Sequence, residues 1–342
     1  MEISVLQRVR DNLSEKRSNL SSWLQTTPSQ KREVNLGPAG EANLQEHLRV
    51  LDDAITQAAD ENLGTCEICE CYIGDELVQL DYTAGVCIDH LSYDEARQLE
   101  QELELSQTVQ RALLPHQAPL IPGLDVAVFS RPAQIVGGDY FDFFQFRDGA
   151  HALAIADVAG HGMAAGLLMA SMMTALHTIT PETEYPSEVV KRVNRFFSHN
   201  VNFTTFVTLF LGRFDPESKR LLYCNAGHNP PLLVRHHPNG HEPVVWLKPT
   251  GAAVGLVEDY SITASAVKLD AGDTLLLYTD GITEANSPSG EMFGAARLAE
   301  VVRKLIKSPA KELVRTIWQE VQDFLAGQTP ADDATLVALK LL

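Results

Sequence analysis

Four short motifs, each built around aspartate, constrain this chain more than any other feature. Three of them stand where an apolar run typical of a buried strand meets a turn. Carboxylate oxygens at strand ends can converge in a folded domain, and hard divalent cations prefer such oxygen ligands. The four motifs are Gly137-Gly138-Asp139, Asp157-Val158-Ala159-Gly160-His161-Gly162, Thr279-Asp280-Gly281 and Asp332-Asp333-Ala334-Thr335. The sequence therefore predicts one carboxylate cluster, assembled from segments that are remote along the chain.

Such a cluster suits the hydrolysis of a phosphate monoester. Enzymes accelerate this reaction by up to about 10²¹-fold, mainly through charge stabilisation and an activated water. Two divalent ions supply both effects when a few carboxylates hold them and water fills the remaining positions. Mg²⁺ and Mn²⁺ favour this kind of octahedral oxygen site. We therefore expect Mn²⁺ or Mg²⁺, two ions per site, as the catalytic cofactor.

Composition limits the other classes of function. The chain has 342 residues, with 45% hydrophobic and 21% charged residues, which is ordinary for a globular protein with two domains or one domain and a module. Its net charge is −18. Residues 1–97 hold 8 Lys and Arg against 18 Asp and Glu, so the acidic excess is present from the start of the chain. Direct DNA binding and docking on anionic lipid are both disfavoured.

The sequence predicts neither a secretion signal nor a segment that spans a membrane. The first residues contain no apolar signal-peptide region. The longest uncharged apolar stretch, Met163 to Leu176, is too short to span a bilayer and is interpreted as a buried helix. We expect a cytoplasmic protein with no membrane contact.

Residues 1–95 are expected to form a helical hairpin with a small zinc-binding module. Apolar residues recur at helical spacing over residues 2–26 and 41–62, and a polar Pro- and Gly-containing turn separates the two runs. A third helix is predicted over 92–114 and ends before Pro115, so that residues 96–115 connect the module to a domain at 116–342. The apolar stripe at 99–113 either pairs with a second copy in a homodimer or packs on its own domain.

The C-terminal region predicts an α+β domain. Strand-like runs occur in groups that are interrupted by pairs of helices, which favours a layered arrangement over strict alternation. The predicted strands are Asp125–Ser130, His151–Ala156, Thr205–Arg213, Arg220–Asn225, Thr274–Tyr278 and Thr335–Leu341. The predicted helices are Met163–Thr178, Ser187–Asn200, Ala295–Ile306 and Ala310–Leu325.

Four cysteines cluster within the first hundred residues. Cys66-x-x-Cys69, a gap of 17 residues and Cys87-x-x-His90 match the spacing of a ribbon-type site for structural Zn²⁺. Cys71 either replaces one of these ligands or stands beside the site. Cys224 lies in a strand-like run and is interpreted as a small core residue.

This region resembles the DksA/TraR family of zinc-finger proteins. The matching residues are Leu51-Asp52-Asp53-Ala54-Ile55, Gly64-Thr65-Cys66-Glu67-Ile68-Cys69-Glu70 and Cys87-Ile88-Asp89-His90. The resemblance covers about residues 1–95 and implies a coiled-coil hairpin that reaches into a channel of RNA polymerase. The turn from Thr26 to Gly40 lacks the family's Asp-x-x-Asp-x-Ala tip motif. A sensory or interaction module is therefore the first reading, and an RNA polymerase contact is the second.

The aspartate motifs resemble the metal-dependent serine/threonine phosphatase (PPM) superfamily, in its bacterial SpoIIE/RsbU branch, over about residues 108–342. That resemblance implies a sandwich of two antiparallel sheets flanked by helices. It rests on Leu113-Leu114-Pro115, Arg131-Pro132-Ala133, Val136 to Asp142, Asp157 to Gly162, Asn225-Ala226-Gly227-His228-Asn229-Pro230, Thr279 to Glu284 and Asp332 to Thr335.

The resemblance also implies roles for individual residues. Asp157 bridges two ions, and the backbone carbonyl of Val158 binds one of them. Asp139 serves the first ion, directly or through water. Asp280 holds the second ion together with Asp332 or Asp333, a choice that the sequence leaves open.

Four further side chains carry two interpretations each. His161 either donates a proton to the leaving serine or holds the loop at the start of a helix. His228 is expected to fix a turn near the site. Asp142 either supports the ligands or is an exposed strand residue. Arg131 either contacts phosphate or is a surface arginine.

These expectations combine into a leading hypothesis and an alternative. The leading one is a metal-dependent protein serine/threonine phosphatase acting on a phosphorylated regulatory protein, such as an anti-sigma-factor antagonist, under control of the zinc module. The alternative is a transcription regulator that acts on RNA polymerase through the zinc-finger hairpin. In a related reading, the zinc cysteines sense metal or redox state and gate the phosphatase.

Overall fold

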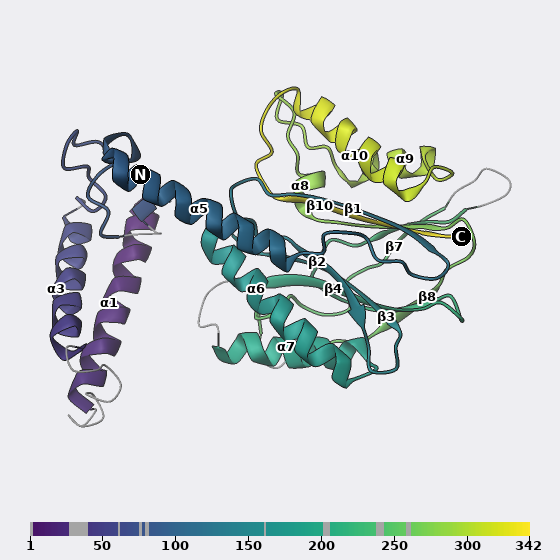
Figure 1. The fold of residues 1–342 in the computed structure, drawn as a ribbon, viewed down its shortest axis with the longest axis horizontal. Coiled ribbons are helices and arrows are strands. Elements are labelled where there is room, and N and C mark those ends of the chain that lie inside the picture. Colours follow the sequence, from purple (N-terminus) through teal and green to yellow (C-terminus); the bar gives the residue numbers. More distant parts are fainter. Residues whose placement is uncertain are drawn as a thin grey trace. The chain divides into compact units, whose positions relative to one another are not determined.

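The protein is described by a computed structural model that covers residues 3–26, 40–60, 62–74, 77–78, 82–160, 162–200, 206–236, 243–257 and 261–342 (Figure 1). The chain forms two compact units, Met1–Glu102 and Leu103–Leu342. The division falls inside helix α5 (Tyr93–Leu113), within the segment predicted as a connection. Each unit is described separately below.

The N-terminal unit contains the two predicted hairpin helices, α1 (Ile3–Thr26) and α3 (Gly40–Ala59), which lie side by side (Figure 1). Leu13 of α1 packs with Leu51 and Ala54 of α3 in a small buried cluster. Arg17 and Asp52 form an ion pair between the helices, with Nε and Oδ1 2.8 Å apart. The turn from 27 to 39, where a tip would lie, is outside the described residues.

Two five-stranded antiparallel sheets form the frame of the second unit. The first sheet has the order β1-β10-β9-β6-β7 and the second the order β2-β3-β4-β5-β8. The strands of the first sheet are β1 (Leu124–Arg131), β10 (Ala334–Leu341), β9 (Thr274–Tyr278), β6 (Leu232–Val234) and β7 (Val244–Trp246). Those of the second are β2 (Tyr140–Gln145), β3 (His151–Val158), β4 (Val207–Asp215), β5 (Arg220–Ala226) and β8 (Ser265–Lys268).

The sheets pack face to face, and helices cover both outer faces. Ile155 of β3 and Val337 of β10 point into the core between the sheets. Ala154, the neighbour of Ile155, faces the helices α6 (Gly162–Ile179) and α7 (Pro186–Asn200), because successive side chains in a strand point to opposite faces. On the other side, Ala338 faces α9 (Ala295–Lys304) and α10 (Ala310–Leu325). The predicted two-sheet sandwich with flanking helices is confirmed.

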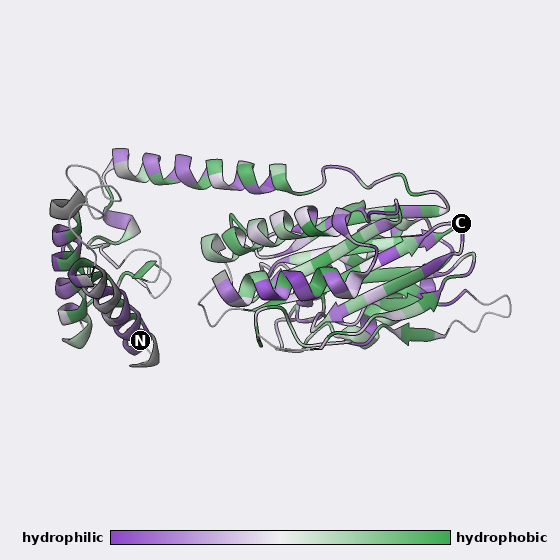
Figure 2. Ribbon diagram, turned by 90° about the horizontal axis from the view of Figure 1, so that it is seen from below, coloured by the Kyte–Doolittle hydropathy of each residue, from purple (hydrophilic) through white to green (hydrophobic). Residues whose placement is uncertain are grey.

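Hydropathy follows the same layers: the strands are mostly hydrophobic (Figure 2). The helices α7, α9 and α10 each carry one hydrophobic and one polar side, whereas α6 is apolar along most of its length. The six predicted strands and the four predicted helices of this unit are present, with ends that differ by a few residues. Four strands were not predicted. β6, β7 and β8 are only three or four residues long, and β2 consists of YFDFFQ, in which aromatic residues hide the alternation.

Helix α6 is the core helix expected from the apolar stretch. Met169, Met172 and Leu176 are fully buried and belong to the same cluster as Ala154 and the other β3 residues that face the helices. By length and composition alone, Gly162–Glu182 is the single helix among the described residues that is apolar enough to cross a membrane. One side of α6 packs against the second sheet, whereas Leu167 on the same helix is 67% exposed.

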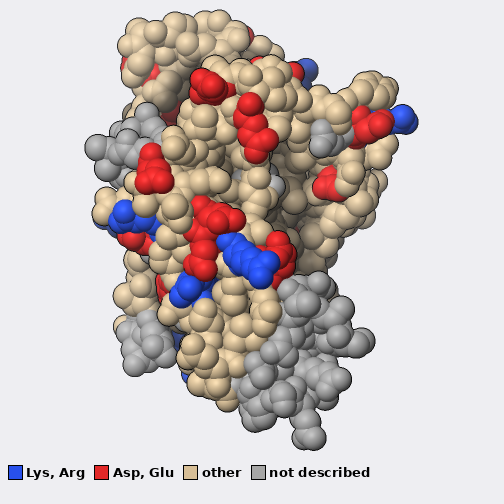
Figure 3. Space-filling model, turned by 90° about the vertical axis from the view of Figure 1, so that its left-hand side faces the viewer, with Lys and Arg blue, Asp and Glu red and all other residues tan. Residues whose placement is uncertain are grey.

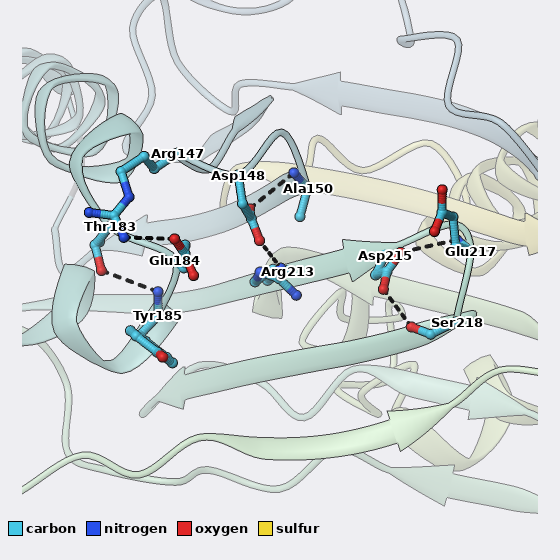
Figure 4. A network of polar contacts seen from close by, with 10 residues as sticks. All are labelled: Arg147, Asp148, Ala150, Thr183, Glu184, Tyr185, Arg213, Asp215, Glu217 and Ser218. Carbon is cyan, nitrogen blue, oxygen red and sulfur yellow. Dashed lines mark hydrogen bonds and ion pairs between the residues drawn. The ribbon is translucent and has the colours of Figure 1, made fainter.

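Polar contacts stabilise the turn between β2 and β3 (Figure 4). This turn lies at the start of β3, whereas Asp157 lies near the end of that strand. Arg147 donates to Glu184 over 2.6 Å, and Asp148 accepts from Arg213 of β4. These pairs hold the turn between β2 and β3 against the neighbouring strand and the segment after α6.

Candidate active site

The second sheet brings two aspartates to one edge. Asp139 immediately precedes β2, and Asp157 is the second-last residue of β3. β2 and β3 are antiparallel, with Tyr140 opposite Ala156, so the start of one strand lies beside the end of the other. The adjacent positions of Asp139 and Asp157 therefore follow directly from the register.

The first sheet contributes the other acidic residues in the same manner. Asp280 follows β9, and Asp332 and Asp333 precede β10. The two strands are antiparallel, and the amide of Thr279 donates to the carbonyl of Thr335 over 3.1 Å, so these ends also coincide. All four predicted motifs thus meet at one edge of the sandwich.

Thr279 joins the two sheets at this edge. Its hydroxyl donates to Oδ2 of Asp139 over 2.8 Å, and its oxygen accepts the amide of Thr335 over 2.9 Å. The side chain is fully buried, so these bonds fix the orientation of the Asp139 carboxylate. The Thr279-Asp280-Gly281 motif alone predicts no role for Thr279. Its position directly before Asp280, at the end of a buried strand, was the available signal.

The carboxylates raise one another's pKa. Burial raises the pKa of Asp139 well above its ordinary value, and the negative charge of Asp157 adds to this. Burial, followed by the charges of Asp280 and Asp332, raises the pKa of Asp157 to about 7. Burial and then Asp332 raise the pKa of Asp280 to about 6. This mutual repulsion is the electrostatic signature of a site that gains stability when cations enter it.

Glu284 belongs to the same electrostatic group, although the sequence analysis assigned it no role. Its charge raises the pKa of both Asp157 and Asp280. It follows the short helix α8 (Asp280–Thr283), which begins at Asp280. The side chain of Glu284 is exposed.

Asp332 and Asp333 are used differently. Oδ1 of Asp333 accepts the amide of Ala133 over 2.7 Å, and Oδ2 accepts the amide of Gly138 over 2.6 Å. Both oxygens of this buried carboxylate therefore hold the loop between β1 and β2. Asp332 is exposed and acts electrostatically on Asp157 and Asp280.

Two glycines are required by this close packing. A Cβ atom at Gly137 would lie 2.4 Å from Oδ2 of Asp333. A Cβ atom at Gly281 would lie 2.1 Å from the backbone oxygen of Asp333. Gly138 is nearly as confined, because its Cβ would be 3.0 Å from the carbonyl oxygen of Val158. The glycines in these motifs thus let three backbone segments approach within van der Waals distance.

The last turns of α5 also hold the loop that carries Asp139. Nε2 of Gln110 donates to the carbonyl of Gly137 over 2.5 Å, and the amide of Gly137 donates to Oε1 over 3.0 Å. Gln107 donates to the carbonyl of Ile135 over 3.2 Å. No motif marked these glutamines in the sequence, because their contact depends on a helix and a loop that meet only in the fold.

Of the two histidines in the predicted motifs, His228 lies among the described residues and His161 does not. His228 is buried, its Nδ1 lies 2.8 Å from Oγ1 of Thr208, and its amide donates to Oδ1 of Asn225 over 2.8 Å. Burial lowers the pKa of His228 to about 4. His228 thus fixes the turn after β5 through Asn225. Through Thr208, the β4 residue opposite Asp157, it also connects this turn to the strand that carries Asp157.

Asp142 is neither exposed nor directed at the ligands. It is buried and accepts hydrogen bonds from the hydroxyl of Tyr140 at 2.9 Å and the amide of Phe143 at 2.6 Å, and it pairs with Nε2 of His177 on α6 at 2.5 Å. Arg131 is exposed, and its guanidinium lies 5.6 Å from the centre of the Trp318 ring.

The second predicted metal site lies in the N-terminal unit. The ligand atoms of Cys66, Cys69, Cys87 and His90 all lie within 4.8 Å of one another, the only such His, Cys, Asp or Glu group in the described part of the chain. The Sγ atoms of Cys69 and Cys87 are 3.8 Å apart, as are Sγ of Cys66 and Nδ1 of His90. A zinc tetrahedron with Zn–S bonds of about 2.3 Å has S–S edges of about 3.8 Å.

Local structure explains how these ligands are aimed. The amide of Cys66 donates to the carbonyl of Cys71 over 2.9 Å, which closes the first knuckle. The amide of Cys87 donates to Sγ of Cys66 over 3.3 Å. This hydrogen bond is the largest of the effects that lower the pKa of the Cys66 thiol to about 6. A thiolate is the form that binds zinc. Cys71 is exposed and is not a member of the four-ligand group.

Comparison with solved structures defines the class of protein. The SiaA-PP2C domain of Pseudomonas aeruginosa superposes with a TM-score of 0.62 at 21% identity, covering 72% of this chain and 98% of that domain. The RsbU and RsbW domains of Rv1364c from Mycobacterium tuberculosis give a TM-score of 0.54 at 27% identity, covering 65% of this chain and 61% of that one. The second unit therefore has the fold of the PP2C-type phosphatases.

Residues 147–342 match the family described as Stage II sporulation protein E (SpoIIE), and the chain belongs to that family. Phosphoserine phosphatase RsbU of Bacillus subtilis is 28% identical over 277 residues, which cover 78% of this chain and 80% of RsbU. Protein IcfG of Synechocystis is 31% identical over 265 residues, covering 70% of this chain and 41% of IcfG.

Proposed function

We propose that this SpoIIE-family phosphatase removes phosphate from serine or threonine of a phosphorylated regulatory protein and requires Mn²⁺ or Mg²⁺. The observation that carries the proposal is the meeting of Asp139, Asp157, Asp280 and Asp332 at one edge of the two sheets. The relatives support it, since RsbU and RsbP of Bacillus subtilis are both named phosphoserine phosphatases.

The residues at this edge fit two hard cations. The donors are oxygen atoms, which Mg²⁺ and Mn²⁺ prefer, and their spacing is wider than in the Cys/His group, which leaves room for water ligands. Asp157 would stand between the ions, with Asp139 and the Val158 carbonyl on one side and Asp280 and Asp332 on the other. When bound, the ions supply Lewis-acid charge stabilisation and a nucleophilic water near neutral pH.

The protein's own groups position this chemistry. Thr279 orients Asp139 through its hydroxyl, and Asp333 holds the loop before Asp139 through two amides. We assign the ligand role to Asp332 because both oxygens of Asp333 are already engaged. His161 remains our candidate for the proton donor to the leaving serine.

The direct test replaces Asp157 by Asn and measures hydrolysis of p-nitrophenyl phosphate and of a phosphoserine peptide with Mn²⁺. Turnover of both substrates should be lost while the thermal unfolding transition persists. Asp323→Asn on the exposed face of α10 is the matched control and should keep full activity. Unchanged turnover in the Asp157→Asn variant would refute the mechanism.

The substrate class is also a proposal. By family, an anti-sigma-factor antagonist is the expected phosphoprotein, and the assay should use phosphoproteins encoded near this chain's gene. We place the reaction in the cytoplasm. Hydrolysis of free phosphorylated metabolites in preference to every phosphoprotein tested would contradict this assignment.

The N-terminal unit is proposed as a zinc-dependent regulatory or interaction module. The four ligand atoms within 4.8 Å support the zinc site. Acidic side chains are spread over the face shown in Figure 3, with basic ones among them, which suits a protein partner better than nucleic acid. An RNA polymerase contact remains a prediction, because the turn at 27–39 lies outside the described residues. Capture of polymerase by the full chain but not by a chain lacking residues 1–95 would support it.

A further inference from the structure

A cavity of about 770 Å³ lies beside the carboxylate cluster, within the second unit. Gly137, Asp139 and Asp333, from the loop and ligand region of the proposed phosphatase site, are among its lining residues, and we call this part its floor. Its walls come from the last turns of α5, from the outer strand β1 and from the first turns of α10. We call this cavity the β1 groove.

The exposed charged side chains that line the β1 groove are basic, and we call this part its rim. Arg111 of α5, Arg131 at the end of β1 and Lys311 of α10 all line it, and all three are exposed. The imidazole of His116 also lines the groove. This grouping is notable in a chain whose net charge is −18.

The cationic side chains of Arg111 and Lys311 have no ion-pair partner among the residues that the structure describes. The only acidic residues that line the groove are Asp139 and Asp333, which are buried and already hydrogen-bonded. The exposed charged side chains that line the groove are therefore all basic, which makes its rim complementary to negative charge.

The walls below the rim are apolar. Val126 and Val128 of β1, Phe141 of β2 and Val314 of α10 line them. β1 is the outermost strand of its sheet and pairs only with β10 among the described strands. A groove with apolar walls beside a sheet edge suits a peptide segment in extended conformation better than a compact small molecule.

We propose that the β1 groove binds an acidic segment of the phosphoprotein substrate, close to the phosphorylated residue. This rests on the proposed phosphatase function, because the groove matters for specificity only if its floor is the catalytic edge. Arg111 and Lys311 would contact the carboxylates of that segment, while the apolar walls take its intervening side chains. Such a contact contributes to recognition of the protein substrate and leaves hydrolysis of a small phosphate ester unaffected.

The test compares two labelled phosphoserine peptides of equal length, one with Asp and Glu around the phosphoserine and one with Asn and Gln. Binding to the full chain is followed by fluorescence anisotropy, and turnover is measured with both peptides and with p-nitrophenyl phosphate. The double variant Arg111→Glu/Lys311→Glu should weaken binding of the acidic peptide and lower its kcat/KM by about tenfold. The neutral peptide and p-nitrophenyl phosphate should change by less than about twofold.

Lys307→Glu is the matched control, since Lys307 is exposed but does not line the groove. It should leave all three readouts unchanged. Equal affinity of the unaltered protein for the two peptides, or equal losses in the double variant and in the control, would overturn the groove assignment. Failure of the proposed function would be recognised separately: the unaltered protein would not hydrolyse p-nitrophenyl phosphate with Mn²⁺. The comparison of peptide binding would still test the groove in that case.

Discussion

The side-chain amide of Gln110 pairs with the backbone of Gly137 as a neighbouring strand would, accepting from its amide at 3.0 Å and donating to its carbonyl at 2.5 Å. Gly137 lies two residues before Asp139, so α5 holds the loop that presents a proposed ligand. Asp333 holds the same loop at Gly138. A helix, a loop and a strand start therefore determine together where the Asp139 carboxylate lies.

Replacing Gln110 by Ala should weaken metal binding without abolishing catalysis. Groups that support metal ligands typically change metal affinity by tenfold or more when removed, so the Mn²⁺ concentration for half-maximal activity should rise about tenfold. Turnover at saturating Mn²⁺ should change little. Gln98→Ala, on an earlier turn of α5 where the side chain donates to Glu102, is the control. An unaltered Mn²⁺ titration in the Gln110→Ala variant would contradict the positioning role.

The raised pKa values predict how stability depends on pH when no Mn²⁺ or Mg²⁺ is added. Because the pKa of Asp157 is about 7 and that of Asp280 about 6, the folded protein holds more protons than the unfolded chain between about pH 4 and 7. The contribution of this cluster to stability therefore falls as pH rises through that interval. Added Mn²⁺ should restore stability at pH 8.

The variant that isolates this effect is Asp157→Asn. At pH 8 it should be more stable than the unaltered protein by about 2 kcal/mol, and at pH 5 the difference should shrink. Thermal unfolding at both pH values without added divalent ions measures it. Equal differences at pH 5 and pH 8 would show that the charge of Asp157 is not the cause.

Gly281→Ala tests the close packing behind the site. Its Cβ would stand 2.1 Å from the backbone oxygen of Asp333, so the start of β10 must move, at a cost of about 2–3 kcal/mol. Gly149→Ala is the control, because its Cβ would meet nothing within 4 Å and only the positive φ of +81° opposes it. That strain costs about 1 kcal/mol. Equal losses in denaturant unfolding would remove the argument from the Asp333 contact.

The zinc module predicts a difference between neighbouring cysteines. Cys69→Ser removes a ligand and should abolish the one equivalent of zinc found by elemental analysis of the purified chain. Cys71→Ser should keep it, because Cys71 lies outside the four-ligand group. Zinc loss in the Cys71→Ser variant as well would mean that Cys71 replaces one of the four.

The exposed apolar side chains of α5 lead us to expect a homodimer. Leu105 and Val109 lie one turn apart and are 64% and 52% exposed, so the apolar stripe does not pack on its own domain at these positions. Light scattering should give twice the mass of the chain, and Leu105→Glu/Val109→Glu should give the monomer. Tyr93→Ser, at the exposed start of the same helix, should remain dimeric. A monomeric unaltered chain would rule out pairing through α5.

The sequence alone determined the kinds of element and the residue types of both proposed metal sites. Apolar runs that end in Asp157 and Asp280 predict buried strands with ligands at their ends, and both strands are present. The spacing of Cys66, Cys69, Cys87 and His90 predicted the group that the structure brings together. These features are local, because a strand end or a knuckle depends on a few consecutive residues.

Only the tertiary structure decided which side chains act at long range. Asp333 bonds residues 200 and 195 positions away along the chain, and this contact separates its role from that of Asp332. The attachment of Gln110 to Gly137 and the burial of Asp142 against His177 likewise depend on packing between elements. Sequence periodicity reports which face of an element is buried, but the partner across that face is set by the register and stacking of the two sheets.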